Sequence, residues 1–429
     1  MDYTRFLNPV ARRYQGSLLR RMYKEERDAI YMSGGVPNPV AFPLQSASFN
    51  LIGGGSITLD PKLITDAQQY GHSNGYDPLV KQLKSLIHRI HSPPCWENTD
   101  LLVTPGGQNG LATFIEMMTC PGDYVIAQNP VYSGVISLFQ PYLPKWLTVE
   151  SDNDGMIPDS LRSALSRWKP EDMYHNDDGL PKLLYITPTG SNPTGTVVSE
   201  TRRREIYAIA CQYNLLILED DPYYFLNFAD DQVAPPSYLS LDTEGRVVRF
   251  DSMSKILGPG YRVGYVTGPN FLVDKLLNHQ QTSTFHASVL AQVVLSEVLR
   301  TWGEEGFLAH GQRTMKFYRA QRDVILKAVE KHLKDLCEWE VPKGGMFLWV
   351  KVKGVSDTTE MTLKRALARQ VSVMPGSAFM ADRTKPCPYI RISFSSATHQ
   401  ELEEGIRRLA LVIRDELKLQ STYEQGKQQ

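Results

Sequence analysis

Short apolar runs alternate with amphipathic stretches through the middle of the chain. Runs of about four residues, of the kind that form buried strands, recur at Leu101–Thr104, Tyr124–Ala127, Leu183–Ile186, Leu215–Leu218, Val247–Phe250 and Val263–Val266. Apolar positions spaced at i, i+3, i+4 and i+7 predict helices over 78–91, 111–118 and 202–213. Strands that alternate with helices indicate an α/β fold, a mostly parallel sheet covered by helices on both faces.

The pattern changes near residue 302. A long amphipathic helix is predicted to residue 334, then strand-like runs over 344–350, 371–374 and 389–394, and a last helix over 401–417. We therefore expect three parts: residues 1–44 as an N-terminal arm and part of a small domain, 45–301 as a large domain, and 302–429 as a smaller α+β C-terminal domain.

Composition narrows the class of protein. The chain has 429 residues, 42% of them hydrophobic and 22% charged, which is typical of a globular protein of about two domains. The 46 Lys and Arg nearly balance the 47 Asp and Glu, so we expect neither nucleic acid nor a membrane surface as a partner. Residues 124–144 carry no charge, but prolines and polar residues interrupt them, which argues against a transmembrane helix.

The cysteines and the N-terminus bear on location. Five scattered cysteines without Cys-x-x-Cys spacing favour reduced thiols of an intracellular protein. The first 24 residues contain six basic residues against Asp2 alone. That bias is compatible with mitochondrial targeting or with a plain surface arm, so both the mitochondrial matrix and the cytoplasm remain open.

Polar clusters follow four of the predicted strands. They occupy residues 104–108, 187 onward, 219–221 and 251–255. In open α/β sheets, ligands bind at the carboxyl ends of strands, so we expect one shared site there.

Lys255 is the central candidate within these clusters. A lysine amine held near a carbonyl carbon forms an imine and becomes a covalent catalyst. Ser252, Ser254 and Arg262 lie close to it in sequence and are suited to a phosphate, Arg262 through its planar fork. An amine for an aldehyde beside donors for a phosphate suggests pyridoxal 5'-phosphate (PLP), although such a motif by itself is often a solvated loop.

Further candidates lie at other strand ends. Gly107 and Gln108 open a helix whose N-terminus suits a phosphate or is an ordinary helix start. Asp220 ends an apolar strand and needs a cation, which a protonated pyridine nitrogen or a metal shared with Asp221 would supply. No nearby histidine or third carboxylate supports the metal, so we expect none.

Aromatic and amide side chains complete the candidate set. Asn192 offers a side-chain hydrogen-bond donor, and Tyr223 offers a hydroxyl that could bond the ring oxygen of the cofactor. Tyr132 offers a ring that could stack on the cofactor. For both tyrosines, packing in the core is the alternative. Arg391 lies between Ile390 and Ile392 and needs a carboxylate, either from a substrate or from a structural ion pair.

Taken together, these motifs resemble the class I/II aminotransferases, PLP-dependent enzymes of fold type I, over nearly the whole chain. The resemblance is carried by Gly34–Pro39, Asn129–Tyr132, Ser191–Gly195, Asp220–Tyr223, Ser252–Lys255 and Tyr389–Arg391. It is strongest to the members that act on kynurenine and α-aminoadipate, through segments such as Trp168–Asp172 and Trp302–Phe307.

The resemblance implies a role for each position. Lys255 would hold PLP as an imine, Asp220 would pair with the pyridine nitrogen, and Asn192 and Tyr223 would bond the ring oxygen beneath the stacked Tyr132. The phosphate would be held by Ser252, Ser254, Arg262, the backbone of Gly107 and Gln108, and Tyr70 of a neighbouring subunit in a homodimer. Substrate would meet Arg391 and Asn192 at its α-carboxylate end, and Arg20 and Gly35 at its distal end.

Two departures from the family pattern stand out. A serine is expected where this chain has Gly107, so one side-chain phosphate donor is missing and weaker cofactor binding is expected. The stretch Gly258-Pro259-Gly260 also differs, which would shift the loop between Lys255 and Arg262.

The implied reaction is a ping-pong transamination. An L-amino acid (α-aminoadipate, kynurenine, an aromatic amino acid or methionine) would give its amino group to a 2-oxo acid such as 2-oxoglutarate, with Lys255 as general base and acid. Another fold-type I PLP enzyme such as a β-lyase, or a non-catalytic PLP-binding regulator, is the alternative.

Overall fold

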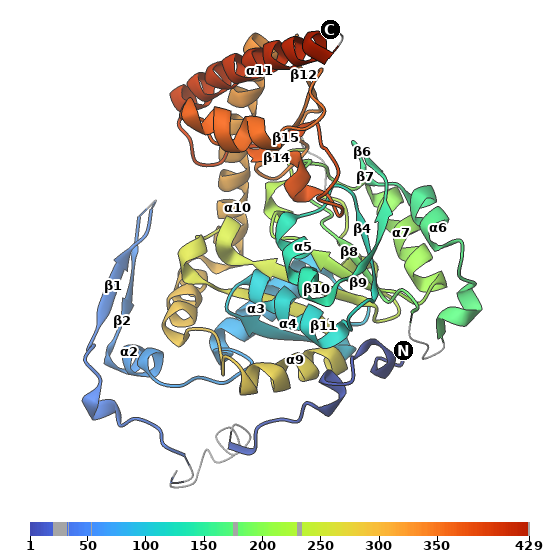
Figure 1. Cartoon of the computed structure of the whole chain (residues 1–429). Helices are drawn as coiled ribbons and strands as arrows, with labels where there is room; N and C mark the ends of the chain where they lie inside the picture. The colour runs from blue at the N-terminus through green and yellow to red at the C-terminus, as the bar shows by residue number, and fades with distance from the viewer. Residues whose placement is uncertain (20–31, 33, 53, 175–178, 230–233, 428–429) are drawn as a thin grey trace.

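A computed structural model describes the chain except for residues 20–31, 33, 53, 175–178, 230–233 and 428–429. Its centre is a seven-stranded sheet (Figure 1). In spatial order the strands are β3 (Thr99–Thr104), β11 (Gly264–Pro269), β10 (Val247–Ser252), β9 (Leu216–Asp220), β8 (Leu183–Ile186), β4 (Tyr124–Gln128) and β5 (Lys145–Val149). The strands from β10 to β5 pair in parallel, which confirms the predicted α/β class.

Helices cover both faces of this sheet, because the side chains of its strands are apolar on each side. One face packs on α4 (Gly107–Met118), α5 (Ser133–Phe139) and α9 (Asn270–Thr282). The other packs on α3 (Asp77–His91), α6 (Pro158–Leu165), α7 (Glu200–Gln212), α8 (Tyr238–Leu241) and the first part of α10 (Val289–Leu333).

Two features of the sheet differ from the pattern-based expectation. Strand β11 runs antiparallel to both of its neighbours, because the chain turns back directly after the Lys255 segment. Strand β5 extends the sheet at the other edge, where the sequence pattern predicted no strand. A strand with alternating polar residues at a sheet edge lacks the continuous apolar run that marks the central strands.

A second sheet follows α10 and is antiparallel throughout. Its four strands, in spatial order, are β12 (Cys337–Trp339), β13 (Phe347–Val352), β15 (Tyr389–Ser393) and β14 (Met374–Pro375). The second part of α10, α11 (His399–Lys427) and a π-helical segment (Met361–Ala366) pack around it. Helix α10 spans both sheets and breaks at Gly303, whose φ of 64° is left-handed, next to the expected domain boundary at residue 302.

The first residues of the chain pack against the core of the large domain, whereas a surface arm was expected. Phe6, Leu7 and Ala11 are buried against the α4 and α9 face of the large sheet. The Asn8 side chain donates to the carbonyls of Glu116 and Thr119. The expectation of a surface arm is therefore wrong for these first residues, whose apolar side chains find a place in the core.

A two-stranded hairpin follows the N-terminal segment. Strands β1 (Ala47–Asn50) and β2 (Ser56–Leu59) precede α2 (Pro61–Gln68), and their tip projects away from the body of the molecule (Figure 1). A smaller hairpin consists of β6 (Ser151–Asp152) and β7 (Gly155–Met156). On the first hairpin, Phe49 and Ile52 are exposed.

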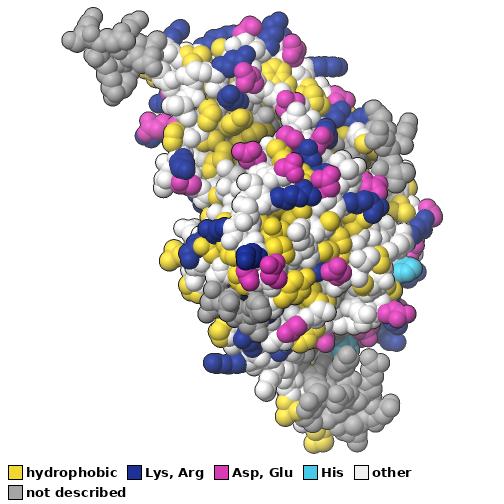
Figure 2. All heavy atoms as spheres, turned by 90° about the vertical axis from the view of Figure 1, so that its right-hand side faces the viewer, with side chains coloured by type: hydrophobic (Ala, Val, Ile, Leu, Met, Phe, Trp, Pro, Cys, Tyr) yellow, Lys and Arg dark blue, Asp and Glu magenta, His cyan; other side chains and the backbone are white. Residues whose placement is uncertain are grey.

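The surface carries both signs of charge. Figure 2 shows basic and acidic side chains interspersed over one face of the molecule, without a large area of one sign. None of the helices in the described part of the chain has an apolar stretch of the length that a membrane crossing requires.

Candidate active site

A pocket of about 460 Å³ lies at the carboxyl ends of β8, β9 and β10, facing the antiparallel sheet. Its volume is in the usual range for a cofactor or substrate site. The predicted residues that line it are Gly107, Gln108, Tyr132, Asn192, Asp220, Tyr223, Ser252, Ser254, Lys255, Arg262 and Arg391. The structure thus brings together side chains that are spread over almost 300 residues of sequence.

Lys255 lies in a 3-10 turn (η8, Met253–Lys255) that begins where β10 ends. Ser252 caps this turn by accepting a hydrogen bond from the Ser254 amide. Burial, Arg262 and Arg391 together lower the pKa of Lys255 below its ordinary value. A lysine with a lowered pKa is more often neutral, which is the form that acts as a nucleophile or a base.

Four groups converge beside Lys255 to form an anion cradle: Arg262, Ser254, Ser252 and the N-terminus of α4. Arg262 has a left-handed φ of 51°, and its Nη1 lies 3.4 Å from the Ser254 hydroxyl. The hydroxyl of Ser252 and the N-terminus of α4 complete the cradle, since the first amides of a helix have no intrahelical partner.

Close backbone approaches shape the cradle. A Cβ at Gly106 would lie 2.4 Å from Nη2 of Arg262, and one at Gly264 would lie 2.3 Å from the Gly107 nitrogen. At Gly107 itself the space is tight, because a Cβ would lie 3.2 Å from the carbonyl oxygen of Asp251. A side chain at residue 107 would therefore require a small shift of its surroundings.

Asp220 ends β9 on the face of the sheet that bears Leu218 and Phe250. Burial raises its pKa to about 6, and the nearby Asp221 and Asp251 add to the rise, while a hydrogen bond from Tyr185 opposes it. No ion pair with a cation is found for Asp220 within the described residues. A carboxylate in such surroundings favours a positively charged ligand.

Arg391 comes from β15, in the other sheet. Its Nη1 donates to Oδ1 of Asn192 at 2.9 Å, and its guanidinium lies 4.1 Å from the ring centre of Phe347. Its buried Nε has no hydrogen-bond partner among the described residues. Because Arg391 lines the pocket and forms no ion pair among the described residues, its guanidinium is suited to a carboxylate of a ligand.

Two tyrosines line the pocket on either side. The Tyr132 hydroxyl lies 3.4 Å from Oε1 of Gln108. Tyr223 is buried, its ring contacts Phe347 edge-on, and its pKa is raised, first by burial and then by Asp220. Both side chains reach the pocket instead of packing only in the core.

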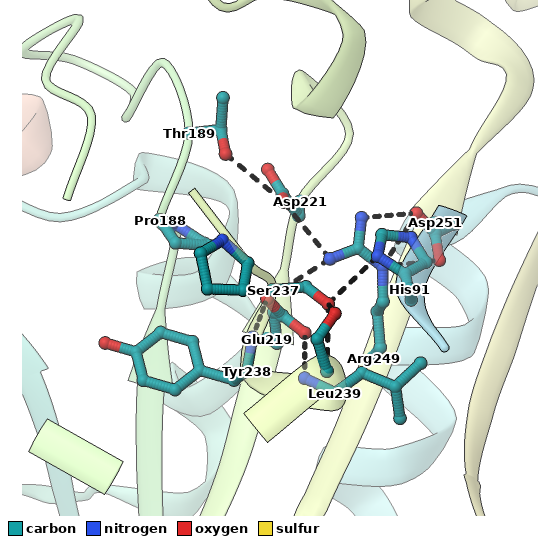
Figure 3. Close-up of polar contacts among 12 residues, drawn as sticks. His91, Pro188, Thr189, Glu219, Asp221, Ser237, Tyr238, Leu239, Arg249 and Asp251 are labelled. Atoms are coloured by element: carbon teal, nitrogen blue, oxygen red, sulfur yellow. Dashed lines mark hydrogen bonds and ion pairs between the residues drawn. The ribbon is translucent and has the colours of Figure 1, made fainter. Parts of the chain in front are cut away.

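A buried ionic cluster surrounds Arg249 (Figure 3). Because side chains alternate along β9 and β10, the cluster lies on the opposite face of these strands from Asp220. The guanidinium of Arg249 contacts Glu219 at 3.2 Å, Asp221 at 3.1 Å and Asp251 at 2.9 Å. The two carboxyl groups of Asp220 and Asp221 therefore face different surroundings, which does not support a metal site shared between them. Burial alone would lower the pKa of Arg249, but the three carboxylates raise it well above its ordinary value.

The same cluster joins two further elements. Both oxygens of Glu219 accept hydrogen bonds from the amides of Tyr238 and Leu239 in α8. Asp221 also accepts a hydrogen bond from Thr189, in the segment that leads to Asn192. The cluster thus connects the segments that end in Asp220, Asn192 and Lys255.

Some expected site residues lie elsewhere. Tyr70 is 44% exposed, Gly35 is exposed, and neither lines this pocket. Arg20 lies outside the described residues. The predicted contact of Tyr70 with a neighbouring subunit stays a prediction.

The candidate residues from the sequence did not include several that the structure places at the site. The pocket is also lined by Ser133, Thr187, Pro222, Phe250 and Phe347, and Tyr185 donates to Asp220. A tyrosine within the apolar run Leu183–Ile186 was the available signal, because the hydroxyl of a buried tyrosine usually finds a partner.

The pocket fits PLP. A lysine amine, a carboxylate without a cation and an anion cradle with no room for further Cβ atoms match the aldehyde, the ring nitrogen and the phosphate of that cofactor. With a mostly parallel sheet covered on both faces, these features define a PLP-dependent enzyme of fold type I.

Comparison with known proteins gives the family. The family described as aminotransferase class I and II matches residues 62–409, and the chain belongs to it. It is 41% identical over 427 residues to a Bos taurus protein named kynurenine/alpha-aminoadipate aminotransferase, mitochondrial, with 97% of this chain and 100% of the relative covered. The chain is a PLP-dependent aminotransferase.

Solved structures agree with this assignment. The crystal structure of aminotransferase Aro8 from Candida albicans superposes with a TM-score of 0.85 at 25% identity, covering 97% of this chain and 99% of that one. A Pyrococcus horikoshii kynurenine aminotransferase, solved in complex with PMP, KYN as substrates and KYA as products, has a TM-score of 0.75 at 29% identity, with 97% and 98% covered.

Proposed function

We propose that this aminotransferase takes α-aminoadipate and kynurenine as amino donors and 2-oxoglutarate as acceptor, with aromatic amino acids and methionine as further donors. The observation that supports a 2-amino acid as substrate is the guanidinium of Arg391, which lines the pocket and forms no ion pair among the described residues. The choice of amino donors is suggested by the names of the bovine relative and of the Pyrococcus horikoshii enzyme.

Each residue of the pocket has a proposed part in the reaction. Arg391 and Asn192 bind the α-carboxylate and so orient the substrate Cα toward Lys255. The cradle of Ser252, Ser254, Arg262 and the α4 N-terminus would hold the cofactor phosphate. Tyr132 would stack on the cofactor ring, and Tyr223 and Asn192 would bond its ring oxygen. When bound, PLP supplies an electron sink for the charge that develops at Cα as its proton leaves.

Lys255 is the proposed acid and base. Its lowered pKa favours the neutral amine, which takes the proton from Cα of the amino acid.

A panel of amino donors tests the substrate assignment. Purified protein loaded with PLP is given single amino acids with 2-oxoglutarate, and glutamate and the new oxo acid are both quantified. We expect α-aminoadipate and kynurenine to have the highest kcat/KM. Products of a β-elimination that form without any 2-oxo acid would instead indicate a lyase.

Replacing Lys255 with Ala tests the catalytic assignment. We expect turnover to fall by more than about a thousand-fold, because proton transfer at Cα loses its base. The exposed Lys351, which pairs with Glu338, provides a matched control, and Lys351→Ala should keep full activity. A Lys255→Ala protein with normal turnover would contradict the mechanism.

We also propose a homodimer that shares its active sites. Exposed apolar side chains recur along residues 40–52, at Val40, Leu44, Phe49 and Ile52. A surface of this kind is suited to a second copy of the chain. Tyr70 would then reach the cofactor phosphate of the partner.

The domain limits and the compartment are part of the proposal. We place the division between a large PLP-binding domain (45–301) and a small domain (302–429 with part of 1–44) at the break of α10. The mitochondrial matrix, which the bovine relative's name includes, and the cytoplasm are the two candidate compartments. Cell fractionation combined with N-terminal sequencing distinguishes them.

A further inference from the structure

Tyr185 is the hydrogen-bond donor of Asp220. Its hydroxyl lies 2.5 Å from Oδ2 of Asp220, and it is the hydrogen-bond partner found for that carboxylate among the described residues. Tyr185 itself is buried within β8, with about 1% of its surface exposed. The parallel register of β8 and β9 sets Tyr185 opposite Leu218, so Asp220 follows on the same face two residues later.

The direction of this hydrogen bond is fixed by charge. Burial and the charge of Asp220 raise the pKa of the Tyr185 phenol well above its ordinary value, so the phenol keeps its proton and donates. The Thr187 hydroxyl lies 3.3 Å away and donates in turn to the Tyr185 oxygen. A chain of two donors that ends on a carboxylate strengthens the last hydrogen bond.

Asp220 depends on this donor because burial and two neighbouring carboxyl groups oppose its charge, while among its charged neighbours Arg249, on the opposite face of the sheet, favours it by a smaller effect. Asp221 and Asp251 both disfavour the ionised form, and burial does so more strongly. A hydrogen bond to the charged form counteracts those effects. It also fixes Oδ2, which leaves the other oxygen to face the pocket.

We propose that Tyr185 is a positioning residue, whose hydroxyl keeps Asp220 ionised and aimed at the ring nitrogen of the cofactor. The inference rests on the proposed function of the pocket. Tyr185 does not touch substrate or cofactor in this arrangement and acts only through Asp220.

The test compares the affinity of apo-protein for PLP across pH. In Tyr185→Phe the ring is kept and only the hydroxyl is removed. The loss of one hydrogen bond to a charged group should raise the Kd for PLP about tenfold near pH 7.5. The affinity for PLP should fall as pH decreases, because Asp220 becomes protonated. In Tyr185→Phe this fall should occur at a pH about one to two units higher than in wild type, because Asp220 without its donor is protonated more easily.

Two comparisons separate this role from a purely structural one. Tyr238→Phe removes another buried hydroxyl, one without a hydrogen-bond partner in the described structure, and should leave the Kd and its pH profile unchanged. With 1-deazapyridoxal phosphate, which has carbon in place of the ring nitrogen, wild type and Tyr185→Phe should bind equally. Thr187→Val should shift the pH profile in the same direction as Tyr185→Phe, by less.

The results distinguish the two levels of the proposal. A wild-type protein that binds no PLP would overturn the proposed function. A wild type that binds PLP, together with a Tyr185→Phe variant of unchanged Kd and pH profile, would overturn only the role of Tyr185. A defect that persists with the deaza cofactor would overturn it too, because the effect would then not depend on the ring nitrogen.

Discussion

At the scale of single residues, the pocket holds side chains whose charge state is set by their surroundings. The pKa of Lys255 is lowered by burial and two arginines, and that of Asp220 is raised to about 6 by burial and two carboxyl groups. Groups shifted in this way are common where a protein is prepared for a reactive ligand. The cofactor would supply the partner that each of them lacks.

Asp220→Asn should stabilise the apo-protein at neutral pH. The pKa of Asp220 in the folded protein lies above its ordinary 3.8, so the folded state binds the proton more tightly than the unfolded chain does. The stability from that proton is lost as pH rises from about 4 through 6. Asn is uncharged at every pH and avoids the cost of a buried charge. We therefore expect Asp220→Asn to raise the free energy of unfolding of the apo-protein by roughly 2–3 kcal/mol at pH 7.5, and the difference to disappear near pH 4.

Urea unfolding of both apo-proteins at the two pH values measures this difference. With PLP present the wild type should be more stable than Asp220→Asn, because the variant has lost the partner of the ring nitrogen and binds the cofactor less tightly. An Asp220→Asn apo-protein that is less stable than wild type at pH 7.5 would show that burial does not penalise this carboxylate.

Single site residues were predictable from the sequence to different degrees. Lys255, Ser252, Ser254 and Arg262 occur in one short segment, and the chemistry of their side chains by itself suggests a phosphate and an aldehyde. Tyr185 and Arg249 lie inside apolar strands, where pattern analysis registers only the strand. Their partners are set by pairing between strands, which a single sequence does not display.

At the scale of elements, the strands β9 and β10 separate two polar environments. Asp220 faces the pocket, while Arg249 and its three carboxylates lie buried on the other face. The central strands were predicted because each is a continuous apolar run. The antiparallel direction of β11 was not, since a buried strand has the same pattern in either direction.

Arg249→Met should destabilise the protein by about 3–5 kcal/mol, because it leaves three buried carboxylates without their cation. The loss should be smaller at low pH, where protonation removes the repulsion among those carboxylates. Burial already raises the pKa values of Asp221 and Asp251, and both would rise further in the variant, so its stability increases as pH falls toward 5.

Urea denaturation at pH 5 and pH 7.5 checks both statements. Arg300→Met provides the control, because Arg300 is 66% exposed and its pairing with Glu297 should contribute at most about 1 kcal/mol. If the two substitutions lowered the free energy of unfolding equally, the buried cluster would contribute no more to stability than a surface ion pair does.

At the scale of the whole molecule, the pocket is formed by two sheets. Lys255 and Asp220 come from the parallel sheet and Arg391 from the antiparallel one, and α10 joins the two through the break at Gly303. The sequence indicated this division by a change of pattern at residue 302. It did not reveal that one helix runs through the boundary, because the predicted helix began at the break itself.

Mixing two inactive protomers tests the proposed sharing of sites. Tyr70→Phe and Lys255→Ala homodimers should each be impaired at a PLP concentration that saturates only the wild type. After subunit exchange, a mixed dimer contains one site with an intact Lys255 and an intact Tyr70 from the partner. Random exchange should then restore about a quarter of wild-type activity.

The control for this experiment is the same mixture without exchange, prepared from cross-linked homodimers. If Tyr70 served the site of its own subunit, no combination would contain an intact site, and activity would not recover.

The buried carboxylate of Asp220 has a consequence for the supply of the protein in a cell. A chain without its cofactor keeps at Asp220 a buried negative charge that has no ion-pair partner among the described residues. Newly made protein is therefore at its least stable before it meets PLP, and is then most exposed to proteases. The amount of enzyme should follow the availability of the vitamin from which PLP is made, so that a deficiency reduces the number of molecules as well as the fraction that is active.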